Sequence, residues 1–229
     1  MSGRLVELSS LGAADVEAVR AIYEGAFPDE LLAPFEDLLV DRMLVYLAGE
    51  DGVEREDGRG VPVGLALVRD LVDAAPTGRG DTGWTFLRYF AAGRRGQGIG
   101  SALWSELTDR LRGEGRTRLV WDVEDPDEPG LAAHRVEEHR RRIVFYERLG
   151  GRLRPVRDYL PPHDDGHAPR LLLMDQPLGP GAAGSEQVGQ QVGPQVGLRE
   201  LVETVYALRY GVPADDPVVR RTLAASGLV

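Results

Sequence analysis

The sequence predicts a mixed α/β fold (α+β, with a mixed sheet) that carries a helical extension at its C-terminus. Strand-like and helix-like segments alternate along most of the chain, and a glycine-rich loop joins one strand-like run to a helical run at residues 93–100. The composition then changes abruptly after residue 178. We therefore expect a folded domain over residues 1–178, a flexible Gly/Gln/Val linker over 179–196 and a helical tail over 197–229.

The first half of the chain predicts one helix and three strands before residue 71. Val16, Val19, Ile22 and Tyr23 recur at helical spacing, whereas the runs on either side of them are typical of strands. In chain order the expected segments are a strand over 4–8, a helix over 14–25, an acidic amphipathic stretch over 29–41, and strands over 43–48 and 61–70. The loop over 49–60, rich in Glu, Asp and Gly, makes the last two a β-hairpin.

The second half continues the alternation. Leu103, Leu107 and Leu111 lie four residues apart, and Gly150 is a natural residue to end a helix. The expected segments are a strand over 84–91, a helix over 100–111, a strand over 118–124, a helix over 131–149, strands over 152–160 and 170–176, and tail helices over 198–210 and from 217. The last helix is indicated by Asp216-Pro217, a capping residue followed by proline at the first helical position.

The composition excludes several kinds of chemistry. The chain has no Cys, Lys or Asn, which removes disulfides, cysteine-based zinc sites, thiol nucleophiles and Schiff-base lysines. Because the formal net charge is −10, we expect no nucleic-acid and no membrane partner. We expect no metal, since His163 and His167 lie in a Pro/Gly loop without a rigid frame. No secretory signal is visible in residues 1–9, so the cytoplasm is the expected location.

The strongest motif is the glycine-rich loop between the strand over 84–91 and the helix that follows it. Glycines at 96, 98 and 100 let the backbone approach a ligand closely, and the positive end of the helix favours an anion such as pyrophosphate. A dinucleotide-binding fingerprint is one alternative, with Asp122 as a ribose contact. It would need Gly or Ala where Leu103 stands. An ordinary tight turn is the other alternative.

Two motifs together resemble the GNAT superfamily of acyl-CoA-dependent N-acyltransferases. The run Arg95-Gly96-Gln97-Gly98-Ile99-Gly100 is similar to the family's Arg/Gln-x-x-Gly-x-Gly/Ala signature, and Phe145-Tyr146 resembles its later aromatic-tyrosine pair. Both occur in the family's order, and the element order over about the first 178 residues agrees. The resemblance therefore implies a GNAT-like fold and acetyl-CoA as cosubstrate. The chain departs from the family in lacking the Asn that follows the fifth strand, and in a longer interval between Glu124 and Tyr146.

The resemblance also implies which residues bind the cosubstrate. Backbone N–H groups of the loop would hold the pyrophosphate, and the preceding strand would pair with the pantetheine arm. The backbone N–H near Phe90 would polarise the thioester carbonyl. The expected cosubstrate-binding residues are Phe90, Ala91, Ala92, Arg95, Gly96, Gln97, Gly98, Ile99, Gly100 and Ser101.

Three residues are candidates for proton transfer. By resemblance, Tyr146 would protonate the departing thiolate, and its ordinary pKa of about 10 suits that leaving group. Glu124 and Asp122 lie two apart on one strand, hence on one face, and either could act as general base. The alternative for the two carboxylates is that they solvate the strand end or pair with Arg118 or Arg116. The alternative for Tyr146 is a merely packed aromatic ring.

The acceptor side is the least specified part of the hypothesis. The resemblance places Glu30, Phe35, Tyr159 and His163 beside the acceptor. The function expected is acetyl transfer from acetyl-CoA to a primary amine of a small molecule or peptide, by direct attack in a ternary complex. The alternative is a catalytically inactive acyl-CoA-binding sensor or regulatory domain. The apolar stripe of the tail helix would complete the chain's own core, support a homodimer or bind another partner.

Overall fold

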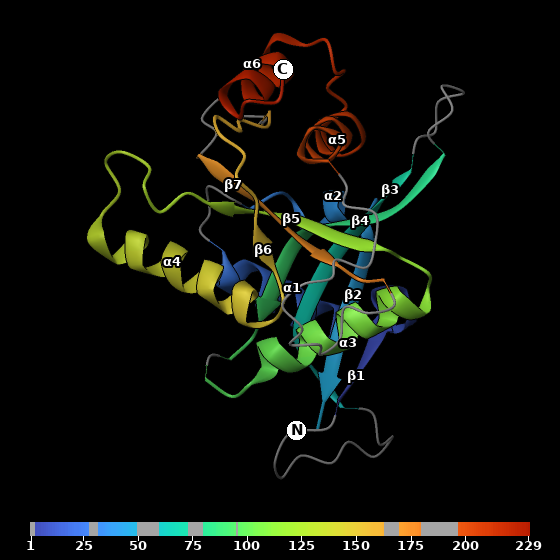
Figure 1. The fold of residues 1–229 in the computed structure, drawn as a ribbon. Coiled ribbons are helices and arrows are strands. Elements are labelled where there is room, and N and C mark those ends of the chain that lie inside the picture. Colours follow the sequence, from blue (N-terminus) through green and yellow to red (C-terminus); the bar gives the residue numbers. More distant parts are fainter. Residues whose placement is uncertain are drawn as a thin grey trace, which may run out of the picture. The chain divides into compact units, whose positions relative to one another are not determined.

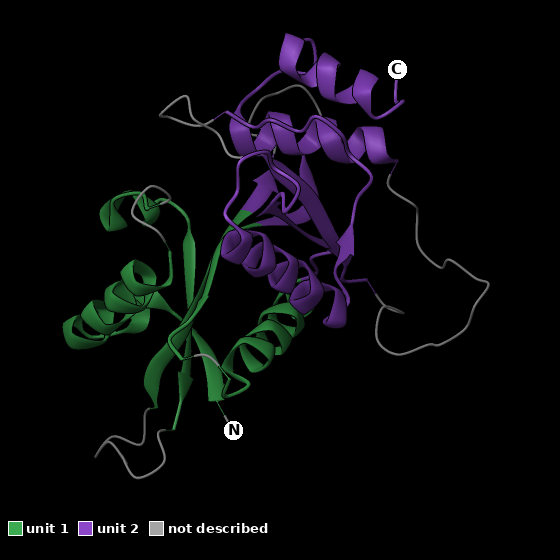
Figure 2. Ribbon diagram, turned by 90° about the vertical axis from the view of Figure 1, so that its left-hand side faces the viewer, with its two compact units in different colours: residues 1–69, 87–114 green, residues 70–86, 115–229 purple. Residues whose placement is uncertain are grey.

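A computed structural model describes residues 3–27, 32–49, 60–72, 80–94, 96–162, 170–179 and 197–229. Seven strands within these ranges have the order β1-β2-β3-β4-β5-β7-β6, and helices flank them, which confirms the predicted mixed α/β fold (Figure 1). The chain divides into two compact units, coloured separately in Figure 2. Unit 1 comprises residues 1–69 and 87–114, and unit 2 comprises residues 70–86 and 115–229.

The elements follow the predicted order closely. The strands are β1 (Gly3–Glu7), β2 (Arg42–Ala48), β3 (Val61–Val72), β4 (Asp81–Ala92), β5 (Arg118–Glu124), β6 (Arg152–Leu153) and β7 (Leu171–Pro177). The helices are α1 (Ala13–Ala26), α2 (Phe35–Leu38), α3 (Ile99–Gly113), α4 (Ala133–Arg148), α5 (Leu198–Thr204) and α6 (Pro217–Ala225), with a 3₁₀ turn η1 (Leu8–Ser10) and a π-helix η3 (Val205–Arg209).

In unit 1, two helices cover opposite faces of the strands. Successive β2 residues alternate between the faces, so Val45 packs in the α1 cluster while Tyr46 packs against Leu103 of α3. Every residue of β2 from Met43 to Ala48 is therefore buried. This explains why the segment is an uninterrupted apolar run rather than an alternating one.

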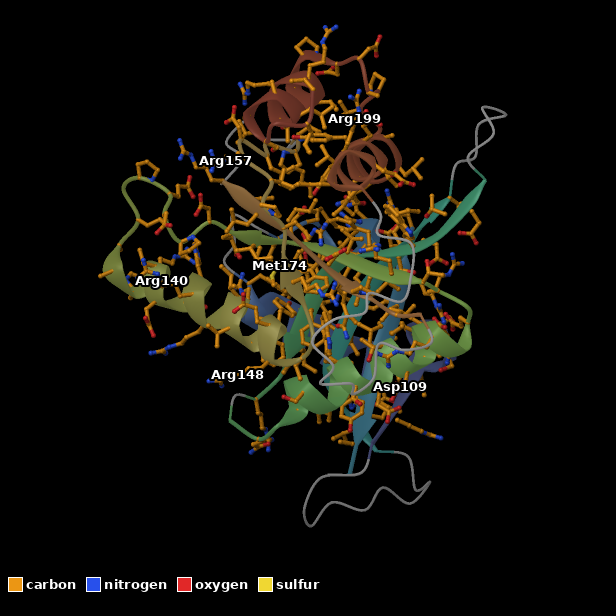
Figure 3. All side chains as sticks on the ribbon, viewed as in Figure 1. Asp109, Arg140, Arg148, Arg157, Met174 and Arg199 are labelled. Atoms are coloured by element: carbon orange, nitrogen blue, oxygen red, sulfur yellow. The ribbon has the colours of Figure 1, made fainter. Side chains whose placement is uncertain are left out.

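In unit 2, the strands β5 and β7 form an antiparallel pair that is also covered on two faces. Trp121 packs against Tyr146 of α4, with ring centroids 5.1 Å apart, whereas Val120 on the other face packs against the tail. Met174, labelled in Figure 3, pairs with Trp121 across the two strands. The two faces of one strand pair thus receive different helices, α4 and the tail.

Two expectations about element length are wrong. The strand expected over 152–160 is only Arg152–Leu153, because Pro155 has no N–H to donate and Asp158 has a φ of 55° that no strand residue adopts. The acidic stretch expected over 29–41 is helical only at Phe35–Leu38 within its described part. A proline at the position before the helix, Pro34, sets this start.

The tail packs against its own chain. Leu201, Val202, Val205 and Tyr206 are buried in one cluster with Val120 and Leu173 of the strands. Ser226, beyond α6, donates to and accepts from the backbone of Arg157, which is labelled in Figure 3. Unit 2 therefore contains the described tail, residues 197–229. The domain boundaries expected at 178 and 197 stay a prediction, and residues 180–196 of the expected linker lie outside the described ranges.

We expect Leu201→Ala to lower the free energy of unfolding by about 2–5 kcal/mol, the cost of a large-to-small change in a packed core. Leu201 is 1 % exposed, so its truncation leaves a cavity between the tail and the strands. Denaturant unfolding monitored by circular dichroism measures the effect. Leu39→Ala is the matched control, since Leu39 is 52 % exposed. Equal effects of the two changes would mean that the tail does not contribute to the core.

Candidate active site

The glycine-rich loop of unit 1 ends at the N-terminus of α3, as predicted. Gly98 is the residue before the helix and has a left-handed φ of 74°, and no side chain caps the helix there. Gly96 has a φ of 80°, and apart from its chain neighbours a Cβ built at either glycine would meet no atom of the described residues within 4 Å. The first N–H groups of α3 therefore lie beside open space, at the positive end of a fifteen-residue helix. This arrangement suits an anionic group.

The end of β4 leads directly into this loop. Phe90 packs on Trp104 of α3 with centroids 5.4 Å apart, and Ala91 and Ala92 belong to the apolar clusters of the same unit. Ile99 is 1 % exposed and faces the core, so it can contribute to a ligand only through its backbone N–H. Gln97 is exposed, and Arg95 lies outside the described residues.

Glu124 forms an ion pair with Arg142 of α4, in which one guanidinium nitrogen contacts both carboxylate oxygens. Burial alone would raise the pKa of Glu124 and is the largest single influence, but Arg142 outweighs it, so the pKa lies below its ordinary value. The carboxylate is therefore held in its charged form. This favours a structural or electrostatic role for Glu124 over a role as general base.

Tyr146 is buried in α4, with its ring against Trp121 and Phe145. Burial raises the pKa of its hydroxyl, Arg142 opposes this rise and Glu124 adds to it. The hydroxyl therefore stays protonated throughout the neutral range, as a general acid must. The structure thus brings Tyr146, Glu124 and Arg142 into one electrostatic neighbourhood of unit 2.

Asp122 lies on the face of β5 that the tail covers. Its Oδ2 accepts a hydrogen bond from the hydroxyl of Tyr210, the residue that follows η3. Burial raises the pKa of Asp122 to about 6, although Tyr210, Tyr159 and Arg209 each lower it. A carboxyl group with that pKa is charged at pH 7 and is a stronger base than an ordinary aspartate.

The residues expected beside the acceptor divide into two groups. Phe35 is 4 % exposed, packs on Tyr23 and lies under the guanidinium of Arg20, so its ring belongs to the core of unit 1. Tyr159 lies next to Asp122 in unit 2, where its hydroxyl has no hydrogen-bond partner within the described part of the chain. Glu30 and His163 lie outside the described residues. Among the described residues, no three His, Asp or Glu side chains converge as metal ligands.

Two residues near these groups were not singled out from the sequence. Arg142 stands in the charge run over 137–142, a pattern typical of a solvated helix face, yet it forms an ion pair with Glu124. The sequence gives little indication of the pairing between Arg142 and Glu124, because α4 also carries exposed arginines such as Arg140 and Arg148, both labelled in Figure 3. Tyr210 is predicted from the sequence only as the last residue of the tail helix over 198–210. Its contact with Asp122 spans 88 positions, and no local pattern indicates such a contact.

The chain is similar to known proteins in sequence and in fold. The family model described as the acetyltransferase (GNAT) family matches residues 16–137, which confirms the resemblance inferred from the two motifs. A protein from Bacteroides thetaiotaomicron assigned to the GNAT acetyltransferases has a similar structure, with 18 % identity, 93 % of this chain and 99 % of that chain covered, and a TM-score of 0.58. At this identity the likeness shows the fold alone.

Two further solved structures are similar over less of the chain. One is the ribosomal-protein-S18-alanine N-acetyltransferase of Escherichia coli, with 19 % identity, 82 % of this chain and 100 % of that chain covered, and a TM-score of 0.47. The other is a Bacillus subtilis acetyltransferase in complex with CoA, with 11 % identity, 77 % and 99 % covered, and a TM-score of 0.47. The comparison with curated proteins gives no match.

Proposed function

Since the chain belongs to the GNAT acetyltransferase family and is therefore an acyltransferase, we propose that it transfers the acetyl group of acetyl-CoA to a primary amine. The observation that carries the proposal is the uncapped N-terminus of α3 behind Gly96 and Gly98, in the position of the family's pyrophosphate-binding motif. The acceptor is proposed to be a small molecule or a peptide, attacked directly in a ternary complex.

The residues present fit acetyl-CoA. The space beside Gly96 and Gly98 is free of protein atoms within 4 Å of a built Cβ, and the N–H groups of Ile99, Gly100 and Ser101 begin the helix without a side-chain cap. Ala91 and Ala92 have small side chains that would let a pantetheine arm lie along the β4 backbone. When bound, acetyl-CoA supplies the acetyl group as a thioester. These observations support its assignment as the cosubstrate.

The proposed reaction divides proton transfer between two residues of unit 2. The acceptor nitrogen forms a bond to the acetyl carbon as the carbon–sulfur bond breaks. Asp122 first accepts a proton from the acceptor ammonium, which gives the neutral amine that attacks. Tyr146 donates its hydroxyl proton to the departing sulfur, and the second nitrogen proton passes to solvent as the amide forms. The acetylated amine and the CoA thiol are then the products. Tyr146 and Asp122 belong to opposite faces of β5, so each returns to its starting state by its own proton exchange with solvent. The N–H near Phe90 polarises the carbonyl.

The charge of the chain gives a further indication about the acceptor. With a formal net charge of −10, the protein attracts cationic amines more than anionic ones. A protonated amine also complements the Asp122 carboxylate.

A homodimer and a cytoplasmic location are proposed on the sequence alone. In the described part of the chain, none of the helices has the length and apolar character that a bilayer span requires.

Thiol release tests the proposal directly. The purified protein is mixed with acetyl-CoA and a panel of small amines, amino acids and peptides, and free CoA is measured with a thiol-reactive dye. The proposal expects amine-dependent thiol release and an acetylated product of matching mass. Binding of acetyl-CoA without thiol release for any amine would favour the alternative, an inactive acyl-CoA-binding sensor.

The two carboxylates should respond oppositely to removal of their charge. We expect Asp122→Asn to lower kcat/KM at pH 7 by about 10–100-fold, because only the neutral fraction of the acceptor amine then reacts. The rate of this variant should rise with pH as the amine deprotonates. Its thermal stability at pH 7 should not fall, since burial disfavours the charged form of Asp122 in the folded state. Rate profiles between pH 5 and 9 and melting curves measure both effects.

Glu124→Gln is the matched control. In the unmodified chain the pKa of Glu124 is lowered by folding, so the charged carboxylate stabilises the fold at pH values above its unfolded pKa. This contribution is lost as the pH falls through the folded pKa. The variant should melt at a lower temperature at pH 7 but keep the acidic limb of the rate profile. If Glu124→Gln removes that limb and Asp122→Asn preserves it, the base is Glu124.

A further inference from the structure

We propose that Tyr210 is a positioning residue that holds Asp122 as the base of the reaction, so that the C-terminal tail is a part of the catalytic machinery. The proposal rests on the function proposed above. It starts from one contact, the hydrogen bond that the Tyr210 hydroxyl donates to Oδ2 of Asp122. The family match ends at residue 137, so it assigns no role to this segment.

Several contacts fix the ring of Tyr210. It packs edge-on against Phe86 of β4, with centroids 6.2 Å apart, and lies 6.4 Å from the ring of Tyr206. The guanidinium of Arg209 stacks over both Tyr210 and Phe86, at 4.8 and 5.4 Å from their centroids. The hydroxyl therefore approaches Asp122 from a ring with little freedom to move.

The backbone on both sides of Tyr210 also fixes the position of its side chain. Residues Val205–Arg209 form a π-helix, a form that occurs mostly as single turns and frequently at functional sites. Gly211 then takes a φ of 67°, and Val212 N–H bonds back to Tyr206 O at 2.9 Å, which ends the helix directly after Tyr210. Tyr210 is thus presented at a helix end whose geometry is fixed on both sides.

Hydrogen bonds from other residues also anchor the tail that carries Tyr210. The Tyr206 hydroxyl accepts a hydrogen bond from Leu160 N–H at 3.1 Å and lies 3.0 Å from the hydroxyl of Thr222, which donates to Asp158 O at 2.8 Å. These bonds connect η3 and α6 to the segment that contains Tyr159. The same anchoring therefore holds Tyr159 and Tyr210 beside one carboxyl group.

The other oxygen of Asp122 is left without a partner. Oδ1 is buried without a hydrogen bond of regular geometry from any described residue, and the hydroxyl of Tyr159 lies close enough to the carboxyl to lower its pKa. A buried carboxylate oxygen with too few donors costs free energy, and a catalytic role is one explanation for such an atom in a native protein. An acceptor amine has the N–H donors that Oδ1 lacks. In the proposal, Tyr210 therefore holds Oδ2 and the acceptor amine donates to Oδ1, beside the hydroxyl of Tyr159.

The groups that face Asp122 determine the sign of the expected effect. They are Tyr159 from the segment after β6, and Tyr206, Arg209 and Tyr210 from the tail. The hydrogen bond from Tyr210 stabilises the charged carboxylate and lowers its pKa. Without that bond the pKa of Asp122 rises. As the pH is lowered, a rate that depends on the Asp122 carboxylate is therefore lost at a higher pH than in the unmodified chain.

Tyr210→Phe tests the proposal, because it removes the hydroxyl and keeps the ring. If the pKa of Asp122 rises by about one unit from 6, kcat/KM falls about fivefold at pH 6, about twofold at pH 7 and hardly at pH 9. The acceptor KM and the affinity for acetyl-CoA should change little. The matched control is Tyr206→Phe, which removes another buried hydroxyl of the tail and should affect rates equally at every pH.

A carboxyl titration by carbon-13 NMR reads the same contact without any turnover. The signal of Asp122, assigned with Asp122→Asn, should titrate at higher pH in Tyr210→Phe than in the unmodified chain or Tyr206→Phe. An unchanged titration overturns the assignment of Tyr210, as does a rate ratio that is independent of pH. Should the unmodified chain release no thiol with any amine, the proposed function fails, while the titration still decides whether Tyr210 controls Asp122.

Discussion

Replacement of Tyr146 by phenylalanine is expected to lower kcat by about 10²–10⁴-fold, the range for loss of a general acid. The physical reason is the leaving group: without a proton donor, the sulfur departs as a thiolate into a buried environment. The phenylalanine ring keeps the contacts with Trp121 and Phe145, so the packing of α4 should survive. Steady-state kinetics with saturating acetyl-CoA and acceptor measures the effect.

The affinity for acetyl-CoA separates a chemical role from a structural one. It should be unchanged in Tyr146→Phe, and calorimetric titration measures it. Tyr23→Phe is a suitable control, since Tyr23 is also buried and its hydroxyl bonds the backbone of Ala33, at 3.0 and 3.1 Å, within the core of unit 1. This control should lose stability and keep its kcat. A Tyr146→Phe variant with the kcat of the unmodified chain would assign the proton to another donor.

Replacement of Gly98 by valine is expected to weaken acetyl-CoA binding by at least about 100-fold, since two or more hydrogen bonds to a charged pyrophosphate are lost. The β-branched side chain would occupy the open space beside the first N–H groups of α3, where the phosphates are proposed to bind. Calorimetric titration of the variant with acetyl-CoA measures the loss.

A control is needed because valine is strained at any left-handed position. Gly98 has a φ of 74°, and Gly115, in the turn after α3, has a φ of 79° with equally open surroundings. Gly115→Val carries the same backbone strain, which costs about 1–2 kcal/mol, without touching the loop. It should lower the melting temperature and leave acetyl-CoA affinity intact. Equal affinities in the two variants would place the pyrophosphate elsewhere.

Much of the fold follows from local patterns in the sequence. The strand over 118–124 and the starts of the tail helices agree with the structure to the residue, because apolar periodicity, capping residues and glycine ends act over a few positions. The loop at 93–100 is likewise a local signal. The short β6 could have been anticipated in part, since Pro155 and Pro161 interrupt the expected strand.

By itself, the sequence determined the order of elements, the family and the candidate residues for each role. Only the tertiary structure distinguished the surroundings of the two carboxylates, because their pKa values depend on partners far away in the chain: Arg142 for Glu124 and Tyr210 for Asp122. The same holds for the tail, whose apolar stripe is compatible with several partners until packing joins it to Val120 and Leu173. Burial and charge pairing are properties of the folded neighbourhood, and no short window of sequence contains them.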